Sequence, residues 1–423
     1  MRRILTTLAL LAASLPASAG GGTDPDWSQW RGPKRDGLSP DTGLLKEWPK
    51  EGPPVAWKAT GLGGGYSSVT VLGDRLYTMG DAGDDCNLLC LSVADGKLVW
   101  KLRAGKPHSE GNPQWIGPRA SPATDGKIVI TLAPLGELVC ADAATGKELW
   151  RKDLLTDFGG KVGSWKYSES PLFDGEHVVC VPGGKKGAVL ALKKATGEPV
   201  WQSQEFTDNA EYTSLLPVEI GGVRQYVVMT MNSVAAVAAK DGKLLWKLPR
   251  GGRTAVIPTP IHKDGIVFVT SGYGVGCNLY KVTAEGAAFK AEEIYSDEQA
   301  GVKGGDRTAS HHGGMILLGD HLYGTNDGGL RCVEFKTGKV VWHNRCVGKG
   351  STAYADGHLV VRSENGKGAI ALVEATPSAY KEKGRFEQPA TTRQPPWPHP
   401  VIIGGKLYIR DQDVLVSYDV KAK

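Results

Sequence analysis

Large polar side chains recur at one place in a repeating sequence pattern, just before each of several short β-forming runs. An arginine guanidinium offers a fork of donors that suits a carboxylate, and histidine, tyrosine and glutamate can bond hydroxyl groups. If the repeats bring these positions together, they predict a site for a small anionic or polyhydroxyl ligand. The alternative is that they fill a channel mouth and hydrogen-bond one another. The candidate ligand-binding residues are Tyr66, Arg119, Tyr167, Glu169, Tyr212, His311, His312 and His399, with Lys349 at the matching place in the seventh repeat.

Other kinds of chemistry have little support in the spacing of the residues. His311 and His312 are adjacent, so on a strand they point to opposite faces and cannot readily share one ion. We therefore expect no metal site. The sequence has no Gly-x-Ser-x-Gly, CxxC or CxxCH motif. Residues 348–352 copy part of a phosphate-binding loop, but they stand between two β repeats and not before a helix. No catalytic residue is assigned.

The elements that must position the candidate residues are repeats of about 47 residues. Each repeat carries one turn containing Gly or Asp-Gly, and most carry a second Thr-Gly or Asp-Gly turn downstream; such dipeptides between apolar runs indicate hairpins. Two hairpins give four strands, and four-stranded units of this length are propeller blades. The sequence therefore predicts an all-β fold, an eight-bladed β-propeller. The eight upstream turns lie at 73–74, 125–126, 174–175, 221–222, 264–265, 319–320, 356–357 and 404–405.

A tryptophan closes most repeats, and we expect these indoles to pack between adjacent blades as structural residues. The fifth and seventh repeats lack it, and Phe289 and Phe386 are the expected substitutes. The eighth repeat has only three strands, whereas residues 53–59 near the start form an orphan fourth strand. We therefore expect this N-terminal strand to pair with residues 414–420 and close the ring. The repeated tryptophans are Trp57, Trp100, Trp150, Trp201, Trp246 and Trp342.

The repeated Ala-x-x-Gly-Lys-x-x-Trp pattern resembles the tryptophan-docking repeats of the PQQ-like, quinoprotein-type propeller family. The resemblance covers roughly residues 52–423, and residues 27–33 resemble segments that precede such propellers in exported bacterial members. The family also includes a non-catalytic scaffold lipoprotein of the outer-membrane β-barrel assembly machine. The resemblance implies the fold and leaves two functions open.

Enzymes of this family use pyrroloquinoline quinone (PQQ), a calcium ion held by side chains, a catalytic Asp and often two adjacent cysteines. None of the seven cysteines here is adjacent to another, and the chain is shorter than such enzymes usually are. Trp115, Trp165 and Trp397 lie in loops between blades and could stack on a planar ligand. We expect a non-catalytic binding or scaffold protein without a cofactor. The alternative is a PQQ-dependent oxidoreductase with calcium that oxidises an alcohol or sugar.

The ends and the charge of the chain bear on where it works. Arg2 and Arg3, an uncharged run and Ala17-Ser18-Ala19 are typical of a signal peptide over residues 1–19, cleaved near Ala19. An extension over residues 20–51 and the propeller over 52–423 follow, with residues 52–61 completing the last blade. The net charge is +5, but the basic residues form no cluster that suits nucleic acid. No apolar run is long enough to span a bilayer. We expect an exported protein, periplasmic or secreted, with a protein partner or a small anionic or polyhydroxyl ligand in the envelope.

Overall fold

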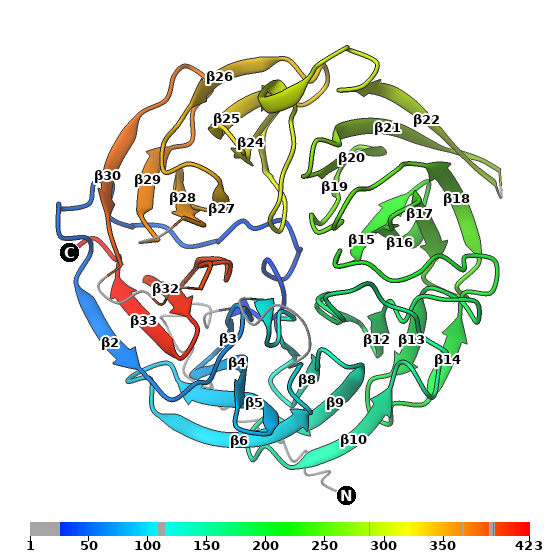
Figure 1. Cartoon of the computed structure of the whole chain (residues 1–423), viewed down its shortest axis with the longest axis horizontal. Coiled ribbons are helices and arrows are strands. Elements are labelled where there is room, and N and C mark those ends of the chain that lie inside the picture. The colour runs from blue at the N-terminus through cyan, green and yellow to red at the C-terminus, as the bar shows by residue number, and fades with distance from the viewer. Residues whose placement is uncertain (1–25, 109–114, 287, 366–367, 389–391, 393) are drawn as a thin grey trace, which may run out of the picture.

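Eight antiparallel sheets form a closed ring around a central channel, as Figure 1 shows for this computed structural model. The structure describes residues 26–108, 115–286, 288–365, 368–388, 392 and 394–423. The expected eight-bladed propeller is confirmed. The proposed signal peptide lies outside the described residues. Among those described, the only helix is the short 3-10 turn η2 (Gly304–Asp306), and none is long and apolar enough to cross a membrane.

Each blade has four strands, which are ordered from the channel to the rim. The blades are numbered in chain order. Blade 1 also carries the short strand β1 (Asp26–Trp27) on the inner side of β3. The strands of blades 1 to 4 are β3 (Thr70–Leu72), β4 (Arg75–Ala82), β5 (Asp85–Ser92) and β6 (Leu98–Gly105); β7 (Ala123–Thr124), β8 (Ile128–Leu132), β9 (Glu137–Asp142) and β10 (Glu148–Asp153); β11 (Leu172–Asp174), β12 (His177–Cys180), β13 (Leu190–Lys193) and β14 (Pro199–Gln202); and β15 (Leu216–Ile220), β16 (Val223–Met229), β17 (Ser233–Ala238) and β18 (Leu244–Pro249).

The second half of the ring follows the same plan. Its strands are β19 (Ile261–Lys263), β20 (Ile266–Ser271), β21 (Gly276–Glu285) and β22 (Ala288–Ser296); β23 (Ile316–Leu318), β24 (His321–Asn326), β25 (Gly329–Glu334) and β26 (Val340–Asn344); β27 (Gly350–Ala355), β28 (His358–Ser363), β29 (Ile370–Glu374) and β30 (Glu382–Phe386); and β31 (Val401–Ile403), β32 (Lys406–Asp411), β33 (Val414–Asp419) and β2 (Val55–Ala59).

The eighth blade contains both ends of the propeller. Its outer strand, β2, pairs antiparallel with β33, and Trp57 lies opposite Ser417. This is the closure that the orphan strand predicted. It removes two sheet edges that would otherwise expose unpaired backbone groups.

Five of the six repeated tryptophans bridge neighbouring blades through their indole N–H groups, whereas Trp246 donates to Gln225 Oε1 in its own blade. Trp57, Trp100, Trp150 and Trp201 each donate to a backbone carbonyl in the next blade, over 2.9–3.1 Å. Each indole also lies against the glycine of the Thr-Gly or Asp-Gly turn in that blade. A side chain at those positions would collide with the ring, and each of these glycines has a positive φ that other residues rarely adopt. The turn and the tryptophan are therefore one packing unit.

The two blades that lack the tryptophan contact the next blade through other aromatic side chains. In blade 5 the strand register places Tyr295 at the tryptophan position, where its hydroxyl donates to the carbonyl of Phe335 over 2.8 Å. The expectation of Phe289 was wrong, because Phe289 lies near the far end of the long β21–β22 hairpin. In blade 7 the register places Gly384 at the tryptophan position, and Phe386, two residues further on, makes the contact: a Cβ on Gly52 would lie 2.6 Å from its ring.

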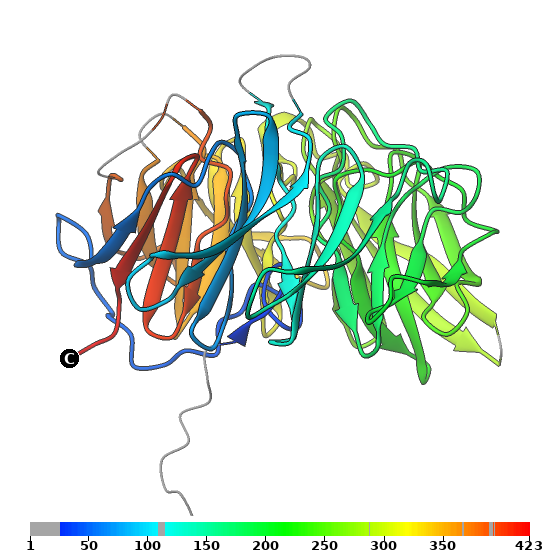
Figure 2. The same cartoon turned by 90° about the horizontal axis from the view of Figure 1, so that it is seen from below.

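The N-terminal extension crosses one end of the channel before it reaches the rim, along the lower face in Figure 2. Arg31 donates to the carbonyls of Gly313 and Met315 in the segment leading into blade 6. Arg35, almost fully buried, donates to the carbonyls of Ser170, Pro171 and Leu215. Burial lowers the pKa of both guanidinium groups, to about 10 for Arg31 and about 9 for Arg35. The two side chains tie the extension to three blades and seal that end of the channel.

All seven cysteines lie in described parts of the chain, and none is in a disulfide. They are buried in the strands and packing layers of the blades. Cys90, Cys140 and Cys332 are each paired with the tryptophan on the neighbouring strand of the same sheet. At these places the thiols act as small apolar side chains.

Candidate functional site

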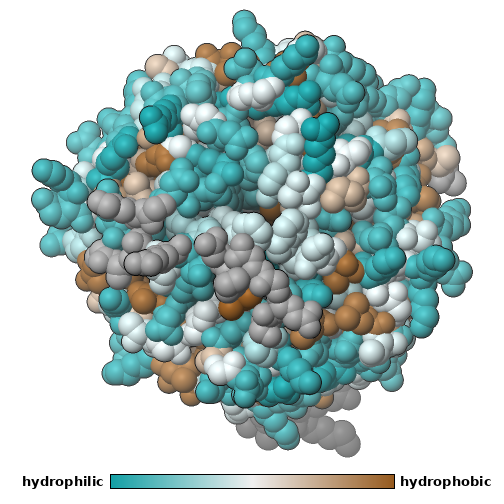
Figure 3. Space-filling model, viewed as in Figure 1, coloured by the Kyte–Doolittle hydropathy of each residue, from teal (hydrophilic) through white to brown (hydrophobic). Residues whose placement is uncertain are grey.

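The open end of the channel leads into a cavity of about 370 Å³, and all eight blades or the segments leading into them contribute to its wall. The face in Figure 3 is hollowed at this point. Its lining is rich in aromatic side chains, as small-molecule sites commonly are. The lining residues are Trp30, Tyr66, Ser68, Trp115, Arg119, Trp165, Ser168, Ser170, Tyr212, Ser214, Thr254, Ala255, Ile257, Tyr273, His311, His312, Gly313, Lys349, Glu364, Trp397 and His399.

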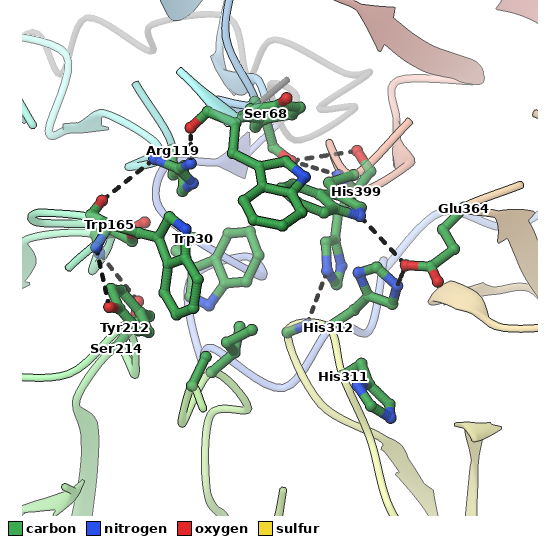
Figure 4. A pocket seen from close by; sticks show the side chains of 18 of the residues that line it. Trp30, Ser68, Arg119, Trp165, Tyr212, Ser214, His311, His312, Glu364 and His399 are labelled. Atoms are coloured by element: carbon green, nitrogen blue, oxygen red, sulfur yellow. Dashed lines mark hydrogen bonds and ion pairs between the residues drawn. The ribbon is translucent and has the colours of Figure 1, made fainter. Parts of the chain in front are cut away.

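The floor of the cavity comes from the extension and not from a blade. The indole N–H of Trp30 donates to Thr259 Oγ1 over 3.0 Å, and its ring meets the imidazole of His399 edge to face at 4.8 Å. Since Arg31 and Arg35, which follow it in the chain, hold the backbone just after it, Trp30 is fixed in place. Trp30 therefore forms the floor of a cup, and Figure 4 shows its indole among the other side chains that line the cavity.

Arg119 stands on one side of the cup among aromatic rings. Its guanidinium donates to the carbonyls of Trp115, Gly117 and Trp165, and lies 5.3 Å from the ring centre of Tyr66. Burial lowers its pKa. Among the described residues, no carboxylate forms an ion pair with it. Asp81 acts on it only at longer range, and burial raises the pKa of Asp81 itself to about 6.

Three of the aromatic side chains form a continuous wall beside Arg119. Trp115 and Trp165 meet edge to face with ring centres 6.0 Å apart, and Trp165 meets Tyr212 in the same way at 5.9 Å. The Tyr212 hydroxyl accepts the backbone N–H of Trp165 over 3.2 Å, and this hydrogen bond holds the two residues next to each other in the wall. Such a wall presents flat apolar surfaces with few hydrogen-bonding groups.

Glu364 organises the opposite side of the cup. Its carboxylate lies 2.6 Å from Lys349 Nζ and 3.1 Å from His312 Nε2, and accepts the indole N–H of Trp397 over 3.2 Å. Burial alone raises the pKa of this carboxyl, but the hydrogen bonds and positive charge of His312 and Lys349 outweigh burial and hold the pKa at about 2. Figure 4 shows His312 and Glu364 facing each other. Glu364 is thus a fully engaged anion.

The two remaining histidines are held by their surroundings. His399 Nε2 accepts the backbone N–H of Gly313 over 3.0 Å, and burial followed by the charge of Arg31 lowers the pKa of the imidazole well below its usual value. His311 Nε2 lies 3.1 Å from Asp327 Oδ1, and its ring packs edge to face on Tyr273 at 4.7 Å. Burial lowers the pKa of His311 as well.

The structure brings most of the sequence-predicted residues together at this cup. Tyr66, Arg119, Tyr212, His311, His312, His399 and Lys349 line it, as do Trp115, Trp165 and Trp397. Tyr167 and Glu169 do not, because they point into the blades: the Tyr167 hydroxyl donates to the carbonyl of Pro182, and Glu169 accepts the N–H of Val181. Their neighbours Ser168 and Ser170 face the cavity instead.

Among the aromatic and charged residues of the lining, sequence reasoning missed three. Trp30 lies in the extension, outside the repeats, although two tryptophans and two arginines in an otherwise polar stretch of a few residues were a signal. Glu364 and Tyr273 sit in turns between inner strands, at places that differ from one repeat to the next. For them the sequence offered no comparable signal.

The donor set does not suit calcium and quinone together. Within the described parts of the chain, no three His, Cys, Asp or Glu side chains converge as metal ligands. Glu364, the only carboxylate among the residues that line the cup, is already bound by three donors. No residue is therefore assigned to either group.

The described residues thus form an eight-bladed propeller with an aromatic cup at one end of its channel. The family model described as outer membrane protein assembly factor BamB matches residues 85–344, and the chain belongs to this family.

Curated relatives match over part of their length. The BamB outer membrane protein assembly factor of Yersinia pestis is 25% identical over 227 residues, 51% of this chain and 52% of that protein. The quinoprotein alcohol dehydrogenase PedE of Pseudomonas putida is 33% identical over 135 residues, 32% of this chain and 17% of that enzyme. The chain spans about half the length of the assembly factors that it matches.

Solved structures share the fold. BamB from Moraxella catarrhalis superposes with a TM-score of 0.58 at 14% identity, over 84% of this chain and 95% of that one. A europium-containing methanol dehydrogenase gives 0.51 at 12% identity, over 94% and 90%. At these identities the likeness establishes the propeller alone, since one fold hosts many functions.

Proposed function

We propose that this protein is an exported propeller of the cell envelope that binds a partner or small ligand at the cup without chemical turnover. The observation that carries the proposal is the state of Glu364. A general base works best with a pKa near the working pH. A carboxylate with a pKa of about 2 is a poor base. Lys349, His312 and Trp397 already bind its oxygens, so a substrate would have to compete with them.

The relatives support a binding role with a protein partner. Three are named as outer membrane protein assembly factors, which supports a role in binding proteins of the envelope. Export of this chain rests on the proposed signal peptide over residues 1–19. We propose the envelope as its location, and its partner as a protein of the same compartment.

The quinone-dependent dehydrogenase is the competing function, since one relative carries that name. A redox assay separates the two. Purified protein is mixed with PQQ, calcium, an alcohol and an artificial electron acceptor, and heat-denatured protein serves as the control. We expect no reduction above the control. Quinone-dependent reduction that disappears in Arg119→Ala would overturn the proposal.

Location is tested separately. A tagged full-length chain is expressed in a Gram-negative host, and the periplasmic and cytoplasmic fractions are compared with those of a variant that lacks residues 2–19. We expect the full chain in the periplasmic fraction and the variant in the cytoplasm. Equal partition of both forms into the cytoplasm would contradict export and leave the redox result unaffected.

A further inference from the structure

We infer that the cup takes an aromatic monocarboxylate, with its acid group on Arg119 and its ring against the tryptophans. The inference rests on the proposed binding function and names the class of ligand. It is carried by one uncompensated cation, by the flat wall beside it and by the engaged state of the other charged groups.

The first step concerns the donors of Arg119. The guanidinium has five N–H groups. Three hydrogen bonds go to backbone carbonyls, which are neutral acceptors, so the Nε–H and one Nη2 N–H have no partner among the described residues. A buried cation without a counter-ion is costly. A carboxylate in the cup would satisfy both unmet needs through charge-assisted hydrogen bonds.

The second step concerns the shape of the surroundings. The carbonyls that hold Arg119 belong in part to Trp115 and Trp165, so the guanidinium and the indole wall are built from the same two loops. Trp30 forms the floor, and Ala255 and Ile257 add apolar surface. A flat aromatic body attached to the acid group would bury its faces on these rings.

The third step limits the number of acid groups to one. Lys349, the other permanently charged base of the lining, is 2.6 Å from Glu364 and is neutralised there. Burial keeps the pKa of His311 and His399 below the usual value, so neither adds charge at neutral pH. Lys349 and His312 both lie against Glu364, so Arg119 is the one cation among the described lining residues with no carboxylate beside it. A tricarboxylate such as PQQ would bring two further anions with no cation to meet them, and a sugar acid would bring hydroxyls to a wall with few acceptors.

The experiment uses the full mature chain and 2-naphthoate as the probe, with binding followed by calorimetry and by quenching of tryptophan fluorescence. Neutral 2-naphthamide, which has nearly the same shape, is the matched control ligand. We expect naphthoate to bind at least about tenfold more tightly than the amide, as for a hydrogen bond to a charged group. Equal affinity of the two ligands, or no binding of either, would overturn the inference.

Two variants place the ligand. Arg119→Gln should lose most of the preference for naphthoate, whereas Arg103→Gln, which removes an exposed arginine paired with Asp85, should keep it. The affinity of the Arg119→Gln variant for 2-naphthamide shows whether the cup is still formed. Tighter binding of glucuronate or of PQQ than of naphthoate would overturn the monocarboxylate assignment. The redox and fractionation assays do not depend on this result, so failure here and failure of the proposed function can be told apart.

Discussion

The indole of Trp150 covers Gly197 of the next blade so closely that a Cβ at Gly197 would lie 2.7 Å from the ring. Trp150→Ala should destabilise the fold by about 3–5 kcal/mol, as other large buried aromatics do. Leu149→Ala, on the exposed face of the same strand, should change stability by less than about 0.5 kcal/mol. Chemical denaturation measures both. An unchanged midpoint for Trp150→Ala would mean that the bridge is not structural.

The same contact can be tested from the other side. Gly197 has φ of +68°, so Gly197→Ala should cost about 1 kcal/mol for the backbone and more for the collision with the ring. In a Trp150→Ala background only the backbone cost remains. We therefore expect the two changes to be less than additive in a double-mutant cycle. Simple additivity would mean that the ring and the turn are not coupled.

In blade 5 the bridging role should belong to Tyr295. Tyr295→Phe removes the hydrogen bond to the carbonyl of Phe335 and should cost about 0.5–1.5 kcal/mol in the free energy of unfolding. Phe289→Leu, at the far end of the same hairpin, should cost less. The reverse order would restore Phe289 as the substitute.

Closure of the ring predicts a large effect of a short deletion. A chain that begins at residue 61 lacks β2 and the extension, and leaves the edge of β33 unpaired. We expect it to lose cooperative unfolding or to aggregate. A chain that begins at residue 26 keeps both segments and should melt like the full-length protein. Equal melting temperatures for the two truncated chains would contradict closure by β2.

Glu169 should make stability depend on pH. Burial raises its pKa to about 8, although the Val181 N–H and Arg35 act in the opposite direction. Because the folded protein then holds this proton more tightly than the unfolded chain, the contribution is complete below about pH 4.5 and is lost as the pH rises towards 8. Glu169→Gln should flatten this decline, and the exposed Glu219→Gln should not. Denaturation midpoints measured from pH 5 to 8 decide between them.

The repeats were sufficient to predict the blades, the closure and most of the cup. The upstream turns recur eight times and the repeated tryptophans six times, and each copy of such a local signal supports the others. Tyr167 and Glu169 were placed wrongly because strand-like segments alternate sides. Ser168, and not Tyr167, matches Tyr66 and Tyr212 in facing the channel.

The extension could not be predicted in the same way. Trp30, Arg31 and Arg35 occur once. Trp30 donates to the hydroxyl of Thr259, and the two arginines donate to backbone carbonyls of blades 3, 4 and 6, which have no signature in the sequence. Phe386 makes the predicted contact from two residues beyond the register position of the tryptophans. Phe386 contacts Gly52, which belongs to the segment before β2. Gly52 stands where other blades have a turn glycine, because no turn joins β33 to β2 in blade 8.

The pairing of β2 with β33 also sets the order in which the molecule can assemble. A ribosome makes β2 near the beginning and its partner near the end, so the eighth blade must wait for almost the whole chain. Contacts between such distant segments form slowly, because a long loop must close before they contribute. A chain that stops early at any point keeps an open ring. Closure therefore distinguishes finished copies from truncated ones, since β2 has no partner strand on any copy that stops before β33.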